Sequence, residues 1–118
     1  MELKGEAKLV RIFVGETDII HHIPVYERIV QEARKLHLAG ATVFKGVMGY
    51  GGTSRIHTAK ILRLSEDMSM IIEIVDAEEK INNFLPLLRD IFEEANCGGL
   101  ITMERAEIIK YVVSDKKS

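Results

Sequence analysis

The spacing of apolar residues predicts a strand and then a helix in the first third of the chain. Residues 6–14 are mostly apolar, interrupted by Lys8 and Arg11, which is typical of a strand buried largely on one face. After a short loop, Pro24 suits the first turn of a helix, which we expect to end near Gly40. That helix carries one apolar stripe at spacings of three and four residues, formed by Tyr26, Ile29, Val30, Ala33 and Leu36.

β-branched and aromatic residues predict the strands of the middle third. Residues 41–47 form one such run, and its exit is rich in glycine. Residues 60–64 and 70–75 form two more, separated by the turn-forming residues 65–67. We interpret these two runs as a single interrupted strand region.

A second helix is predicted to follow residue 76. Asp76 offers a side-chain cap, with Glu79 three residues later, and Pro86 is expected to kink or interrupt the helix because it lacks an N–H. Residues 96–99 supply the stop, and residues 100–113 form the last strand region before a polar tail. The apolar stripe of this helix comprises Ile81, Phe84, Leu85, Leu88, Ile91, Phe92 and Ala95.

The resulting order is βαββαβ, which predicts an α+β, ferredoxin-like fold with an antiparallel sheet covered by two helices on one face. The other face of the sheet would then be uncovered. The strand over residues 70–75 is apolar at almost every position, so it would present apolar side chains there unless a partner covers them. This favours an oligomer, in which a charge at Ile72 or Ile74, whichever faces inward, should dissociate the subunits.

The composition is that of one globular domain. The 118 residues are expected to form a single domain, with an ordered core over about residues 5–112. No apolar run approaches the roughly 20 residues of a membrane span, so we expect no direct membrane insertion. The N-terminus has no signal-peptide pattern and Cys97 is the only cysteine, which favours the cytoplasm. A net charge of −2 argues against nucleic acid as a partner.

Residues 46–58 are the segment best suited to bind a ligand. The segment is rich in glycine and also contains Ser54, Arg55 and His57. Glycines let successive backbone N–H groups converge on an anion, and these side chains could add donors. A plain hairpin tip is the alternative. The segment lacks the lysine of a phosphate-binding P-loop and the basic and second aromatic residues of an RNA-binding strand, so we set both of those readings aside.

The other candidate groups are weaker. His21, His22 and His57 could ligate a metal, although no ligand spacing supports it, and surface histidines are the more common case. Cys97 has no catalytic partner indicated, and the paired acids fit solvated turn and helix positions. Because no nucleophile and base occur together, we expect no enzyme activity.

Several runs resemble, in order, a PII-like family of the GlnB-like superfamily catalogued as domain of unknown function one-ninety. The resemblance covers about residues 5 to 112. It is carried by residues 41–51 (ATVFKGVMGYG), 54–58 (SRIHT), 72–76 (IEIVD) and 79–81 (EKI).

Membership implies a homotrimer whose sheets pack inward, with no resident cofactor. The wider superfamily binds adenine nucleotides in clefts between subunits and engages partner proteins through the loop after the second strand, here residues 49–58. By resemblance, Gly98-Gly99 matches a glycine turn that approaches phosphates, and Lys110 a basic residue of the last strand. The implied ligand-binding residues are Gly49, Tyr50, Gly51, Gly52, Ser54, Arg55, His57, Thr58, Gly98, Gly99 and Lys110.

Departures from the superfamily pattern change the expected ligand. Where the superfamily usually has a lysine after the second glycine turn, this chain has Gly99. Where the superfamily has a second basic residue on the last strand, this chain has Val112. The loop is also short. AMP or ADP is therefore the expected ligand rather than ATP, and true nitrogen regulation is not supported. Two alternatives stay open: a structural or interaction trimer with no small ligand, and a small metal-binding protein.

Overall fold

The computed structural model describes residues 5–49, 57–58 and 68–114. Its principal elements follow the order strand, helix, strand, strand, helix, strand, which confirms the predicted βαββαβ, ferredoxin-like fold. The elements are β1 (Gly5–Gly15), β2 (Ile19–Ile20), β3 (Ile23–Pro24), α1 (Val25–Lys35), β4 (Thr42–Lys45), β5 (Met48–Gly49), β6 (His57–Thr58), β7 (Ser69–Asp76), α2 (Glu78–Ala95) and β8 (Leu100–Ile108).

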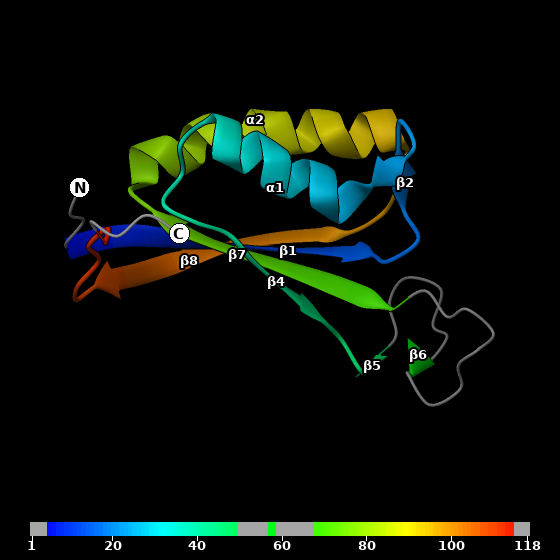
Figure 1. Ribbon diagram of the computed structural model, residues 1–118, viewed down its shortest axis with the longest axis horizontal. Helices are drawn as coiled ribbons and strands as arrows, with labels where there is room; N and C mark the ends of the chain where they lie inside the picture. The colour runs from blue at the N-terminus through cyan, green and yellow to red at the C-terminus, as the bar shows by residue number, and fades with distance from the viewer. Residues whose placement is uncertain (1–4, 50–56, 59–67, 115–118) are drawn as a thin grey trace.

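Four of the strands form one antiparallel sheet in the order β4-β7-β1-β8. Both helices lie side by side on one face of this sheet (Figure 1). We call the other face, which no described helix covers, the open face. In the ranges that the structure describes, no helix is long and apolar enough to cross a membrane.

The core lies between the sheet and the helices. Side chains alternate along a strand, so every second residue of β1 and β7 points to the helices. These inward residues are buried, as are the apolar stripes of α1 and α2. The fully buried members are Val10, Ile12, Val25, Ile29, Ile72, Ile74, Ile81, Phe84 and Leu88.

The same alternation corrects one expectation. Ile72 and Ile74 both have no exposed surface and pack in the helix-covered core, so neither lies on the open face. The residues of β7 on the open face are Ile71, Glu73 and Val75, by alternation. A charge at Ile72 or Ile74 would therefore disrupt the core itself, so the assembly test must use Ile71 or Val75 instead.

Each helix is followed by a residue other than glycine in the left-handed region. Helix α1 stops at Lys35, five residues before Gly40, and His37 (φ 60°) turns the chain. The His37 and Leu38 N–H groups donate to the last carbonyls of the helix. Asn96 (φ 52°) plays the same role after α2. The expected end near Gly40 is therefore wrong for α1, whereas the stop predicted at residues 96–99 is confirmed for α2, at Asn96. Helix α2 also runs through Pro86 without interruption.

Asp76 joins two loops rather than capping α2. Its fully buried carboxylate accepts a hydrogen bond from Ala77 N–H at 2.7 Å and another from Ala39 N–H at 2.8 Å. The N-cap of α2 is Ala77, which makes no side-chain cap, so the predicted capping role is wrong. The carboxylate instead ties the start of α2 to the loop that leads into β4.

Replacing Asp76 by alanine should lower the free energy of unfolding by about 1 to 3 kcal/mol, because two backbone donors lose their acceptor. Asp76→Asn keeps one side-chain oxygen and should lose less. Urea denaturation at a fixed protein concentration measures both variants. An Asp76→Ala protein that unfolds at the wild-type urea concentration would contradict this role.

The last strand is shorter than predicted. Strand β8 ends at Ile108, and the chain then leaves the sheet. The Tyr111 hydroxyl donates a hydrogen bond to the Ala39 carbonyl at 2.8 Å, just before the opposite edge strand β4. We call residues 109–113 the crossing segment, because they pass from the β8 edge toward the β4 edge across the open face.

Candidate functional site

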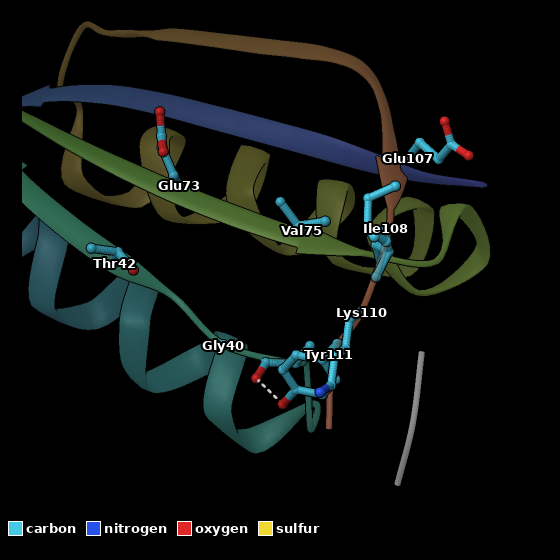
Figure 2. Close-up of a pocket in the computed structure, with 10 residues that line it drawn as sticks. Gly40, Thr42, Glu73, Val75, Glu107, Ile108, Lys110 and Tyr111 are labelled. Carbon is cyan, nitrogen blue, oxygen red and sulfur yellow. Dashed lines mark hydrogen bonds between the residues drawn. The ribbon is translucent and has the colours of Figure 1, made fainter. Parts of the chain in front are cut away.

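A pocket of about 460 Å³ lies where the crossing segment meets the open face. One wall is the sheet, through β4 and β7, and the other is the chain around the end of β8 (Figure 2). Glu73 and Lys110 lie toward opposite ends of this lining (Figure 2). The lining residues are Ala39, Gly40, Thr42, Glu73, Val75, Glu107, Ile108, Ile109, Lys110 and Tyr111.

The pocket combines apolar walls with a few polar groups, as small-molecule sites commonly do. Val75 and Ile108 offer apolar surface for a flat ring. Lys110 offers a positive charge for an anionic group, whereas the carboxylates of Glu73 and Glu107 suit hydroxyl or amine donors. The arrangement therefore suits a ligand with a ring, donor groups and a limited negative charge.

The Tyr111 hydrogen bond holds the pocket together. Because it joins the crossing segment to the loop after α1, it fixes the distance between the two sides of the cavity. Figure 2 shows this bond beside Gly40 and Lys110. The position of Lys110 thus depends on an anchor one residue away.

A charged triad lies on the open face next to the pocket. Arg11 Nε is 2.7 Å from a carboxylate oxygen of Glu73, and Arg11 Nη1 is 3.5 Å from one of Glu104. The three residues come from neighbouring strands β7, β1 and β8. The hydrogen bond with Glu73, together with the charge of Glu104, raises the pKa of Arg11. Glu73 therefore belongs both to this triad and to the pocket lining.

The predicted loop begins and ends on a short antiparallel ladder. Gly49 pairs with His57, and Met48 with Thr58, as strands β5 and β6. This ladder follows β4 at one edge of the sheet (Figure 1). The remaining predicted residues of the loop, Tyr50, Gly51, Gly52, Ser54 and Arg55, lie outside the described residues.

Gly98 and Gly99 lead into β8 at the other edge of the sheet, at the same end as the β5–β6 ladder (Figure 1). They differ in their surroundings. A Cβ on Gly99 would lie 2.5 Å from the Phe13 carbonyl oxygen and 2.5 Å from the Phe92 ring, whereas one on Gly98 would meet nothing within 4 Å. Gly99 is thus required because β1 and α2 pack closely against it. The sequence alone did not reveal this requirement.

Lys110 lies at the opposite end of the sheet from the two glycines. Strand β8 pairs Leu100 with Phe13 at one end and Ile108 with Gly5 at the other, so its whole length separates them. The expectation that Lys110 sits on the last strand is wrong, because the strand has already ended. Within one chain, the glycine turn and Lys110 therefore do not share a pocket.

The surroundings of His21, His22 and Cys97 indicate structural roles and do not support metal binding or catalysis. His21 (φ 46°) and His22 (φ 74°) form the two-residue turn between β2 and β3, and His21 contacts the Glu94 carboxylate, which lowers the pKa of Glu94. Among the described residues, no group of three or more His, Cys, Asp or Glu side chains is placed to hold a metal. Burial raises the pKa of the Cys97 thiol, which disfavours the reactive thiolate.

Sequence reasoning identified one residue of the pocket, Lys110, and missed the others. The sequence pattern predicted only that Thr42 and Glu73 lie in strands and that Tyr111 belongs to the last strand. Thr42 pairs with Glu73 across β4 and β7, a register that no local pattern reveals. Tyr111 enters the site because β8 ends three residues earlier.

Comparison with known proteins identifies the family. The family model DUF190, described as uncharacterized ACR, matches residues 7–108. UPF0166 proteins of Aquifex aeolicus (37% identical over 102 residues; 86% of this chain, 92% of the relative) and Methanocaldococcus jannaschii (34% over 105; 89% and 94%) are similar. A nitrogen regulatory PII-like protein, CPII from Thiomonas intermedia K12, solved with ADP, AMP and bicarbonate, has a TM-score of 0.66 at 15% identity, with 92% and 91% coverage. The chain therefore belongs to the DUF190 family, and its fold is PII-like and ferredoxin-like.

Proposed function

We propose that this protein is a non-catalytic, cytoplasmic PII-like regulator. It binds AMP or ADP in clefts between the subunits of a homotrimer. Through the loop of residues 49–58, it signals to a partner protein whether these clefts hold a nucleotide. The observation that carries the proposal is the pocket on the open face. Its volume, about 460 Å³, is in the usual range for small-molecule sites, and Lys110 lies in its lining. The similar fold of CPII, which was solved with ADP and AMP, supports adenine nucleotides as the ligand class.

The positions of the predicted residues support a site between subunits. The loop leaves the sheet at the β4 edge, and Gly98-Gly99 precede the β8 edge. In a cyclic, head-to-tail assembly, one edge of each copy meets the other edge of the next. Such an assembly brings together groups that lie apart in one chain, and we propose that Lys110 reaches the phosphates in this way.

The open face supports the assembly. Phe44 and Leu100 lie on it at the two edges with 48% and 54% of their surface exposed, and the half-buried Phe13 and Ile71 lie between them. A contiguous apolar surface of this kind on a small domain commonly marks an interaction site. Three copies packing these faces inward would bury it.

A trimer without a small ligand is the second candidate. The observation in its favour is the charge of the pocket lining, where two carboxylates, Glu73 and Glu107, accompany the one ammonium group of Lys110. Such a lining would repel a triphosphate. It is compatible with AMP or ADP only if the phosphates lie toward Lys110 and the neighbouring copy.

Isothermal titration calorimetry with AMP, ADP and ATP tests the nucleotide proposal. We expect AMP or ADP to bind, and Arg55→Ala and Lys110→Ala each to weaken that binding by about 1.5 to 3 kcal/mol, the range for hydrogen bonds to charged groups. Lys35→Ala removes an equal charge from an exposed position at the end of α1 and should leave affinity unchanged.

The calorimetric outcomes separate the hypotheses. Wild-type protein that releases no heat with any adenine nucleotide would refute nucleotide binding and favour the trimer without a ligand. Unchanged affinity in Arg55→Ala or Lys110→Ala would refute the role given to that residue. The trimer is tested separately, through the open face.

A further inference from the structure

The charged groups of the open face can be counted from the strand register. Residues alternate between the two faces, and the pairings of the four strands assign each residue to one of them. Strand β4 contributes Thr42 and Phe44 to the open face, neither of which is charged. Across the four strands, the charged residues on this face are Arg11 from β1, Glu73 from β7 and Glu104 from β8.

These three residues leave one negative charge unbalanced. Arg11 holds Glu73 at 2.7 Å and Glu104 at 3.5 Å, so a single guanidinium faces two carboxylates. Glu104 is the looser partner, with 59% of its side chain exposed against 31% for Glu73. The crossing segment adds Lys110, but this lies at the other end of the pocket from Glu73 (Figure 2). Among the described residues, each copy therefore carries a net charge of about −1 in the middle of an otherwise mostly apolar face.

Burying that surplus charge opposes assembly. Removing ions from water is unfavourable unless each one is paired and hydrogen-bonded. Association through the open face would bring the surplus carboxylate of each copy into a less solvated interface, close to those of the other copies. Protonation of one carboxyl per copy removes the imbalance, because Arg11 and Glu73 then form a matched pair.

We propose that self-association through the open face is coupled to proton uptake at Glu104. The occupant of the face is a second copy of this chain, and the inference rests on the trimer of the proposed function. The sign follows from linkage: the associated state binds more protons than the separated chains, so lowering the pH strengthens association and raising it weakens association. Proton concentration thereby regulates the fraction of assembled, ligand-competent protein.

Sedimentation velocity over a dilution series at pH 7.5 and pH 5 tests this coupling on the full chain. We expect the dissociation constant of the wild-type subunits to be lower at pH 5 than at pH 7.5 by a factor of at least about ten. Uptake of one proton per subunit changes this constant about tenfold for each pH unit over which the coupling acts. Glu104→Gln, which mimics the protonated side chain, should associate at pH 7.5 as tightly as wild type does at pH 5, and should lose most of the pH dependence. If the chains stay associated at the lowest concentration, the rate of subunit exchange gives the same comparison.

Glu79→Gln is the control. It makes the same change of charge at an exposed position of α2, on the helix-covered side of the sheet and outside the pocket, and should keep the wild-type pH response. A wild-type trimer whose association does not change with pH, or a Glu104→Gln protein with the full wild-type response, would overturn the proton coupling and leave the trimer standing. A wild-type chain that is monomeric at both pH values would overturn the coupling and the proposed assembly together.

Discussion

We expect Ile71→Asp to convert the proposed trimer into a folded monomer. Ile71 lies on the open face, directly opposite Phe13 of β1 and Phe44 of β4 in the strand register. An aspartate at this position would place an unpaired charge inside an apolar interface, which costs several kcal/mol per subunit. The half-buried side chain faces away from the helix-covered core, so the fold itself should survive. Light scattering at micromolar concentration should give one chain mass for the variant and three for the wild type.

The control for this variant is Ile19→Asp. Ile19 is 57% exposed and lies in the short β2 ladder, outside the four-stranded sheet, so the same apolar-to-acidic change there should leave a trimer. Circular dichroism checks that both variants are folded. An Ile71→Asp protein that still has three times the chain mass would exclude the open face as the interface.

Gly99→Ala should destabilise the protein by about 3 kcal/mol, whereas Gly98→Ala should change its stability little. The added methyl group at residue 99 would lie 2.5 Å from both the Phe13 carbonyl oxygen and the Phe92 ring. That oxygen belongs to β1, an interior strand paired on both sides, which has little room to move. At residue 98 the same methyl group meets nothing within 4 Å. Urea denaturation of the two variants makes the comparison at adjacent positions.

This pair also separates packing from ligand binding at the glycine turn. If backbone N–H groups of both residues approach phosphate, as the family resemblance implies, Gly98→Ala should weaken nucleotide binding without loss of stability. Equal stability of Gly99→Ala and wild type would show that the close packing at Phe13 and Phe92 is relieved at little cost. The packing role of Gly99 would then be rejected.

The sequence predicted the order of the elements because that order depends on local periodicity. The strand over residues 6–14 and the helix after Asp76 are set by side-chain patterns that repeat within a few residues, so a single chain segment contains the information. The family resemblance rests on the same segments and agrees with the fold.

Element ends were predicted less well, because long-range contacts compete with local signals there. Asp76 looks like a helix cap, but its carboxylate instead bonds Ala39, which lies 37 residues earlier. His37, just after α1, adopts the left-handed conformation that glycine favours, so the helix ends before the expected Gly40. Strand β8 stops at Ile108 although apolar residues continue to Val113.

By itself, then, the sequence determined the fold class, the helix-covered core and the family, because each follows from apolar spacing or from short runs of residues. Only the tertiary structure decided which residues share a face and which end of the sheet each one occupies. Pairing of β4, β7, β1 and β8 places Arg11 between Glu73 and Glu104, residues 62 and 93 positions away along the chain. The bond from Tyr111 to Ala39, 72 positions apart, creates the pocket that holds Lys110. A local pattern contains no information on such pairings, because they are selected by the packing energy of the whole sheet and not by the propensity of any one segment.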